Sequence, residues 1–213
     1  MKNNLKIVMV GAPGSGKGTQ SSKMTVEYGI PHISTGQIFR EKVASKHPLG
    51  KLIESYINKG EFVPDEIGIQ IVIDRLKEED CKNGFILDGF PRSLYQAELL
   101  EKMLEVDYVI NLEISEQRLM DRLCGRRVCS ACGLVTHVSA LSGADVCPKC
   151  GSTLNVREDD KVETIKHRME VYERETKPIV DFYRKRGKLI DVNSDQDSDK
   201  VFEEIKEALS AVC

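Results

Sequence analysis

A short apolar segment runs directly into a glycine-rich turn near the start of the sequence. Residues 5–10 are apolar except for one lysine, and Gly-Ala-Pro-Gly-Ser-Gly-Lys-Gly-Thr follows at 11–19. Glycines let backbone N–H groups curl around an anion, and the positive N-terminal end of a following helix favours phosphate. Lys17 adds a mobile cation for the terminal phosphates of a nucleotide. An ordinary glycine turn is the alternative, but a strand before the loop and a helix after it favour a nucleoside triphosphate site.

Apolar segments of strand length alternate with longer amphipathic segments along most of the chain, which is typical of a parallel sheet covered by helices. The predicted strands span residues 5–10, 30–33, 85–87, 108–113 and 189–192. The predicted helices span residues 16–27, 35–45, 48–59, 65–78, 94–105, 115–125, 161–186 and 198–211. Ser115 is an expected N-cap and Gly125 an expected helix stop. Their helix would then carry Arg122 and Arg126, four residues apart, on nearly the same side.

Four of the seven cysteines fall in the segment 126–160, which breaks this alternation. They form two Cys-x-x-Cys pairs separated by 14 residues: Cys129, Cys132, Cys147 and Cys150. Such pairs predict a zinc ribbon, in which four thiolates close a structural site and leave no position for water or substrate. Two disulfides and free thiols are the alternatives, and ligand type alone leaves iron open. The remaining cysteines are expected to be buried apolar residues or an idle tail thiol: Cys81, Cys124 and Cys213.

The length and net charge of the chain favour a globular protein that binds neither membranes nor nucleic acid. The 213 residues fit one domain with inserts or two small domains, and 31% of them are charged. Residues 7–10 are too few for a secretory signal or a membrane helix, so we expect a cytoplasmic protein without a membrane partner. The net charge of −3 disfavours a nucleic-acid-binding surface. A zinc-ribbon ATPase that grips nucleic acid would need a basic insert, whereas the charges of 126–160 cancel.

Several arginines stand beside predicted turns: Arg40, Arg92, Arg122, Arg126, Arg157 and Arg168. One such arginine alone is an ordinary surface charge. Together they fit a reaction that moves a phosphoryl group between two anionic substrates, because crowded phosphates require neutralisation. A guanidinium group suits this task because it binds phosphate oxygens in pairs.

The motifs of the chain resemble those of adenylate kinase. They are the glycine loop at 11–19, Ile-Ser-Thr-Gly-Gln-Ile-Phe-Arg at 33–40, Leu-Asp-Gly-Phe-Pro-Arg at 87–92, Asp-Arg-Leu-Cys-Gly-Arg-Arg at 121–127 and Arg-Glu-Asp-Asp at 157–160. These blocks follow the order and approximate spacing of the family, so the resemblance spans essentially the whole chain. The combined pattern is most similar to the bacterial form with a long, zinc-bearing lid.

The resemblance implies that MgATP and AMP react to give two ADP, and it assigns residues to each nucleotide. The implied ATP set is Gly14, Ser15, Gly16, Lys17, Gly18, Thr19, Arg122, Arg126, Val135, Thr136 and Gln196. The implied AMP set is Thr35, Arg40, Glu61, Phe62, Val63, Gly89, Phe90, Pro91, Arg92, Gln96, Arg157 and Arg168. Within it the backbone of residues 61–63 would line the base, and the amide of Gln96 would pair with adenine.

The resemblance also implies how the transfer works. AMP phosphate attacks the γ-phosphoryl group directly, so the protein aligns the substrates and compensates their charge. The implied catalytic set is Lys17, Arg92, Arg126, Arg157, Arg168, Asp159 and Asp160, and Asp88 with Thr19 would organise magnesium through water. The implied fold is a five-stranded parallel P-loop sheet with two mobile pieces. The core would comprise 1–33, 64–125 and 161–213, the AMP-binding segment 34–63, and the zinc-binding lid 126–160.

The motifs fit more than one acceptor nucleotide. A related nucleoside monophosphate kinase that prefers UMP, CMP or GMP as acceptor, or GTP as donor, shares the glycine loop. Thr35 and Gln96 favour AMP, but base choice depends on pocket shape. We also expect a monomer, because closing pieces on two sides leave little room for a fixed partner.

Overall fold

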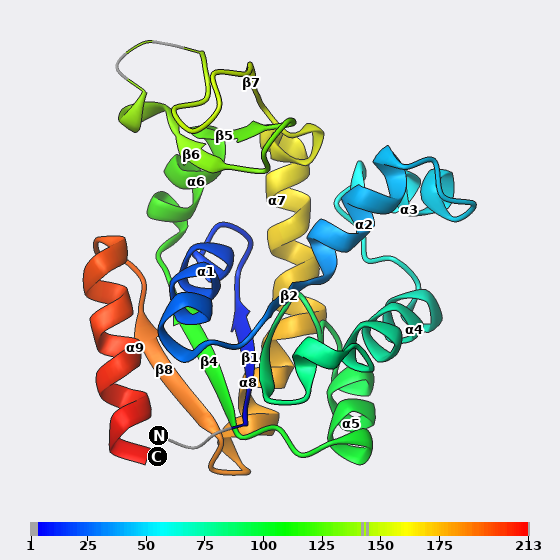
Figure 1. Ribbon diagram of the computed structural model, residues 1–213, viewed down its shortest axis with the longest axis vertical. Helices are drawn as coiled ribbons and strands as arrows, with labels where there is room; N and C mark the ends of the chain where they lie inside the picture. Colours follow the sequence, from blue (N-terminus) through cyan, green and yellow to red (C-terminus); the bar gives the residue numbers. More distant parts are fainter. Residues whose placement is uncertain (1–3, 142, 144, 213) are drawn as a thin grey trace.

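A parallel sheet forms the centre of the molecule in the computed structural model, which describes residues 4–141, 143 and 145–212 (Figure 1). Cys213 lies outside the described residues. Cys81 is buried as predicted, whereas Cys124 is exposed, so the prediction that it is buried is wrong. The five strands are β1 Leu5–Gly11, β2 His32–Ser34, β3 Gly84–Asp88, β4 Tyr108–Glu113 and β8 Leu189–Asn193. Their order is β2-β3-β1-β4-β8, and every neighbouring pair is parallel. The predicted five-stranded parallel sheet is therefore confirmed.

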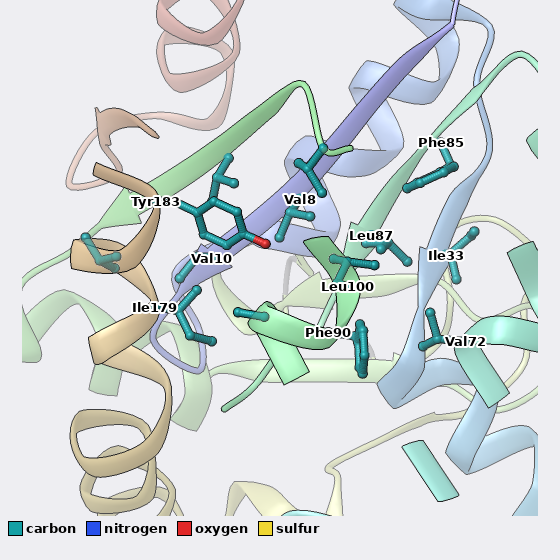
Figure 2. Close-up of a cluster of buried hydrophobic side chains, with 14 of the residues drawn as sticks. Val8, Val10, Ile33, Val72, Phe85, Leu87, Phe90, Leu100, Ile179 and Tyr183 are labelled. Atoms are coloured by element: carbon teal, nitrogen blue, oxygen red, sulfur yellow. The ribbon is translucent and has the colours of Figure 1, made fainter. Parts of the chain in front are cut away.

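Helices cover both faces of this sheet (Figure 1). They are α1 Lys17–Tyr28, α2 Thr35–Ala44, α3 Gly50–Ile57, α4 Asp65–Leu76, α5 Leu94–Met103, α6 Glu116–Cys124, α7 Val162–Val171, α8 Lys177–Arg184 and α9 Ser198–Val212, with a 3-10 turn η1 at Glu79–Cys81. Because successive strand residues point to opposite faces, β1 contributes Val8 to one core and Ile7 to the other. Figure 2 shows the first core, in which Val8 and Val10 lie near Tyr183 of α8. The second core packs under α1 and α9.

The predicted helix at 161–186 is divided into three parts. A π-helical segment, Tyr172–Thr176, joins α7 to α8. The reason is Pro178, which lacks the N–H that an α-helix would use at that position. The hydroxyl of Thr176 donates to the carbonyl oxygen of Arg92 at 2.8 Å, so the widened turn anchors a loop that carries a predicted site residue.

The helix before the cysteine segment ends where the sequence predicts, but for a different reason. Ser115 caps α6 by accepting from the N–H of Arg118. Gly125 follows α6 with φ −83°, so it is not left-handed. A Cβ at Gly125 would lie 1.8 Å from Nε2 of His137, so the glycine makes room for that ring. Arg126 begins the next strand, and the prediction that it shares a helix face with Arg122 is wrong.

The segment from 126 to 155 forms a separate antiparallel sheet at one end of the molecule (Figure 1). Its strands are β5 Arg126–Cys129, β6 Val135–His137 and β7 Leu154–Asn155, in the order β6-β5-β7, with 3-10 turns η2 Val138–Ala140 and η3 Glu158–Asp160 after β6 and β7. It has a small core of its own, formed by Cys129, Leu141, Cys147 and Leu154.

Helices α2 and α3 pack around Phe39 and Ile53 in a smaller core of their own (Figure 1). Ile38 of α2 also packs against the first main core. Among the described residues, no helix combines the length and apolarity needed to cross a lipid bilayer.

Candidate active site

The glycine-rich loop forms a compact turn between β1 and α1. Gly11, Gly14 and Gly16 have φ of 144°, 84° and 98°, conformations that residues with side chains rarely adopt. A Cβ at Gly11 would also lie 2.8 Å from the carbonyl oxygen of Leu112. Gly16 is the N-cap of α1 and offers no side-chain cap, so the N-terminus of that helix remains available to an anion.

Lys17 folds back over this loop. Its ammonium group donates to the carbonyl oxygens of Gly11 at 2.7 Å and Ala12 at 2.9 Å. Loss of surrounding water lowers the pKa of Lys17 to about 8, and the charges of Arg92 and Arg168 act in the same direction, against the attraction of Asp88. A polyanion bound beside Lys17 would therefore strongly stabilise the charged form of its side chain.

Asp88 ends β3 at the carboxyl edge of the sheet and faces the start of α1. Its Oδ2 lies 3.4 Å from Nε2 of His32 and would lie 3.7 Å from a Cβ at Gly18. Burial acts to raise the pKa of Asp88, but the hydrogen bond from His32 and the charge of Lys17 outweigh it and hold the pKa below its ordinary value. Thr19 lines the cleft that Asp88 also lines. An ionised carboxylate suits a hydrated divalent cation.

Arg92 lies in the loop after β3, and the Gly89 carbonyl oxygen of the same loop fixes its guanidinium group. Its Nε donates to the carbonyl oxygen of Gly89 at 2.6 Å, and the Thr35 hydroxyl donates to the same oxygen at 2.8 Å. Gly89 has φ 79°, and a Cβ there would lie 2.7 Å from the Thr35 hydroxyl. The Phe90–Pro91 peptide bond is cis. Burial, followed by the charge of Arg168, lowers the pKa of Arg92 to about 10.

Two carboxylates of the 157–160 motif pair with arginines of different elements. Asp160 accepts from both Nε and Nη2 of Arg126, with 2.7 Å to Nε, and from Nη1 of Arg168 at 3.3 Å. Asp159 Oδ2 lies 3.0 Å from Nη1 of Arg168. Burial acts to raise the pKa of Asp159, but the arginines, Arg168 foremost, hold it below its ordinary value. Asp160 therefore connects the β5 sheet to α7, and Asp159 adds a second contact to α7.

Arg40 and Arg157 complete a cationic centre. Burial lowers the pKa of Arg157 to about 9, with Arg126 and Arg40 acting in the same direction, and its buried Nε has no partner among the described residues. Burial also lowers the pKa of Arg40, where Asp159 opposes the shift. The cationic centre thus comprises six basic groups, Lys17, Arg40, Arg92, Arg126, Arg157 and Arg168. It faces three carboxylates, those of Asp88, Asp159 and Asp160.

Arg122 connects the glycine loop to the chain after β8. Its Nη1 donates to the carbonyl oxygen of Ser15 and its Nη2 to those of Ser194 and Gln196, at 3.2, 2.8 and 3.2 Å. The Gln196 side chain is turned away toward Glu204. The backbone of Gln196, rather than its side chain, therefore lies near the loop.

These groups line a cleft of about 1020 Å³, at the upper end of the range for ligand sites. Most predicted site residues lie on its wall: Gly14, Gly16, Lys17, Gly18, Thr19, Arg40, Glu61, Phe62, Val63, Asp88, Gly89, Pro91, Arg92, Arg122, Arg126, Val135, Thr136, Arg157, Asp159 and Arg168. The others lie behind the wall or beside it: Ser15, Thr35, Phe90, Gln96, Asp160 and Gln196.

Some cleft residues are absent from the predicted set, including Arg118, Asp121 and Lys149. Arg118 lies four residues before Arg122 on α6. This spacing places both arginines on one face of the helix, so the sequence could have predicted Arg118 as a cleft residue. Lys149 reaches the cleft only through the fold of the cysteine segment, so no local pattern marks it.

The four paired cysteines converge on one point. Their Sγ atoms all lie within 4.8 Å of one another, with 3.5 Å between Cys129 and Cys150 and 3.6 Å between Cys132 and Cys147. Ligand sulfurs about 2.3 Å from a tetrahedral zinc ion are roughly 3.8 Å apart. Gly133 and Gly151 turn the chain after each pair with φ 73°. The donor set and its spacing therefore fit a tetrahedral thiolate-binding metal.

Comparisons with known proteins identify the family of the chain. A family model described as adenylate kinase matches residues 9–188. The chain belongs to the adenylate kinase family. It is 49% identical over 212 residues to the adenylate kinase of Caldanaerobacter subterraneus subsp. tengcongensis, covering 96% of each chain. It is 46% identical to that of Bacillus velezensis, covering 98% of this chain and 99% of the relative, and 44% identical to that of Lachnospira eligens, covering 96% and 100%. The predicted membership of the adenylate kinase family is confirmed.

Proposed function

We propose that the cleft transfers the γ-phosphoryl group of MgATP to AMP, giving two molecules of ADP. The cationic centre carries this proposal: six basic groups face three carboxylates, and burial together with repulsion from neighbouring arginines disfavours the charge of Lys17, Arg92 and Arg157. Phosphates of two nucleotides, meeting end to end, would relieve that repulsion. Relatives named adenylate kinase over their full length favour AMP as acceptor over UMP, CMP or GMP.

The two nucleotides are assigned to opposite ends of the cleft. ATP phosphates would lie on the glycine loop, where Lys17 and the N-terminus of α1 meet. AMP would lie between α2 and the Arg92 loop, with its phosphate on Arg40 and Arg92 and its base along residues 61–63. Arg126, Arg157 and Arg168 come from the cysteine segment and α7, and would bind the phosphates where the two nucleotides meet.

The transfer needs no protein nucleophile. The arginines would hold the attacking and leaving oxygens in line and offset the charge of the transferring group. When bound with ATP, Mg²⁺ supplies further charge compensation, and Thr19 with Asp88 would hold its water shell. Asp159 and Asp160 would align Arg126 and Arg168 rather than touch the phosphates, because both arginines are bonded to them.

We assign the catalytic core to 1–33, 64–125 and 161–213, the AMP-binding segment to 34–63 and the lid to 126–160. Two small cores, one under α2–α3 and one under the β5 sheet, support this division, because the buried residues of each lie within its own segment. Closure of both pieces would exclude water, which competes with AMP for the phosphoryl group. We propose that the protein acts as a monomer, because closing pieces on two sides leave little room for a fixed partner.

The four-cysteine cluster is proposed to hold a structural zinc ion. Its four sulfurs leave no open coordination position, so the metal would stabilise the lid without taking part in the transfer. The lid has a core of few residues, which is too small to hold a fold of this size alone.

The acceptor test decides the proposal. With MgATP fixed, purified protein is offered AMP, UMP, CMP and GMP, and ADP formation is followed by a coupled assay. We expect kcat/KM for AMP to exceed that for each of the others by at least about 100-fold. A preference for UMP, CMP or GMP would overturn AMP as the substrate, and no ADP from any acceptor would overturn the proposed reaction.

Proton uptake provides a second test. Because the pKa of Lys17 is about 8 without nucleotide, the side chain is largely neutral at pH 9 and charged at pH 7. Bound phosphates raise that pKa, so MgATP binding should take up about one proton at pH 9 and far fewer at pH 7. Calorimetry in two buffers of different ionisation enthalpy measures this uptake. Equal uptake at both pH values, or the same uptake in Lys17→Met, would contradict the expectation.

A further inference from the structure

The side chain of Gln96 is held at both of its polar atoms. It lies in the first turn of α5 and is 3% exposed. Its Oε1 accepts the backbone N–H of Arg92 at 2.7 Å, and its Nε2 donates to Oδ1 of Asp65 at 2.6 Å. The backbone N–H of Gln96 is bound by the Ser93 side chain. Asp65 of α4 and the loop before α5 thus determine where this amide lies.

These partners accept only one of the two orientations of the amide. A backbone N–H can only donate, and an ionised carboxylate can only accept. Rotation of the amide by half a turn would place its NH₂ against the N–H of Arg92 and its oxygen against the carboxylate of Asp65. Two hydrogen bonds would become two repulsions at a buried position, which is costly.

Each polar atom of Gln96 retains one further hydrogen-bonding position, a lone pair on Oε1 and an N–H on Nε2. Adenine presents the complementary pair, an amino donor at C6 and an acceptor at N1. A 6-oxopurine presents the reverse, an acceptor at C6 and a donor at N1. The amide orientation therefore decides which purine it can bind.

We propose that Asp65 is a positioning residue that fixes the amide orientation of Gln96 and so sets the preference of the acceptor site for adenine over a 6-oxopurine. This inference rests on the proposed function and on the pairing of the Gln96 amide with adenine that the resemblance to adenylate kinase implies. Asp65 is well placed for this role because it begins α4 immediately after residues 61–63 and Pro64, on the side where the base is assigned.

A purely structural role for Asp65 predicts a different outcome. An acid in the first turn of a helix also stabilises that helix through its dipole. Glu66 belongs to the same turn of α4 but is exposed, and it provides the matched control. Glu66→Gln removes the same charge from the helix terminus and leaves the bond between Asp65 and Gln96 intact.

The experiment compares kcat/KM for AMP with that for inosine monophosphate, with MgATP fixed, in the unaltered chain, Asp65→Asn and Glu66→Gln. Asparagine can donate as well as accept, so it removes one of the two repulsions on the rotated amide, and only the backbone N–H of Arg92 still opposes rotation. We expect the AMP preference to fall about tenfold in Asp65→Asn, through a higher KM for AMP with kcat changed less than about twofold. Glu66→Gln should retain the full preference.

Gln96→Ala and the double variant Asp65→Asn/Gln96→Ala complete the design. Gln96→Ala should reduce the preference by at least as much as Asp65→Asn, and Asp65→Asn should have no further effect in that background. Asp65→Ser, which retains a helix-terminal acceptor, replaces Asp65→Asn if the latter does not fold. Calorimetric affinities for the two monophosphates give the same comparison without turnover.

The possible failures are distinct. An equal loss of activity toward both monophosphates, or an unchanged ratio in Asp65→Asn with a reduced ratio in Gln96→Ala, would overturn the role of Asp65 and leave the proposed function standing. An unchanged ratio in Gln96→Ala would overturn the role of the amide as well. If the unaltered chain forms no ADP from AMP, the proposed function itself fails.

Discussion

Lys17→Met should reduce ADP formation by about 100- to 1000-fold while the protein remains folded. The ammonium group lies at the glycine loop and would follow the charge that develops on the transferring phosphoryl group, and loss of one such donor has an effect of about this size. Methionine retains most of the length of the side chain. The coupled assay at saturating MgATP and AMP gives the rate, and circular dichroism gives the fold.

The thermal stability of Lys17→Met distinguishes a catalytic effect from a structural one. In the protein without nucleotide, loss of surrounding water and neighbouring arginines disfavour the charge of Lys17, so its removal relieves repulsion. Its bonds to the carbonyl oxygens of Gly11 and Ala12 are lost at the same time. We expect these effects to offset each other and leave Tm within about 3 °C. Near-normal turnover would remove Lys17 from the mechanism.

Removal of the metal should lower the stability of the lid. If zinc joins the four cysteines, its binding free energy is part of the folding free energy of this segment. We expect dialysis against a chelator to lower the first thermal transition by about 10 °C, equivalent to a few kcal/mol for a chain of this length. Scanning calorimetry with metal analysis of the same samples measures both quantities, and restored zinc should restore the transition.

Two variants separate the metal from other thiol effects. Cys132→Ser removes one of the four ligands and should reproduce the effect of the chelator. Cys124→Ser changes an exposed thiol next to the lid but outside the cluster, and should leave both metal content and Tm unchanged. An unchanged melting curve for the metal-free protein would make a structural metal untenable.

The sequence alone predicts the features that depend on neighbours in the chain. The glycine loop is recognisable because its glycines, its lysine and the start of its helix lie within nine residues, and its backbone conformation requires those residue types. The two Cys-x-x-Cys pairs are recognisable for the same reason. Alternating apolar segments predict the parallel sheet, and Ser115 predicts the start of α6. Both predictions depend on residues close together in the sequence: the apolar pattern of a strand and the residue that caps a helix.

Other features depend on contacts between distant segments, and these were not predictable. The helix expected over 161–186 contains a π-helical segment, and its Thr176 holds the Arg92 loop, 84 residues away. Arg122 and Arg126 were expected on one helix face, but Gly125 must admit the ring of His137, and the chain turns there into a strand.

The sequence by itself determined the chemistry that is available: a loop able to bind phosphate, a set of arginines and a group of thiolates. Only the tertiary structure decided how these groups act on one another. It placed Asp160 between Arg126 and Arg168, and Asp65 against Gln96. The reason is physical: the charge state of an ionisable group and the orientation of an amide depend on neighbours within a few ångströms, and folding brings those neighbours from distant parts of the chain.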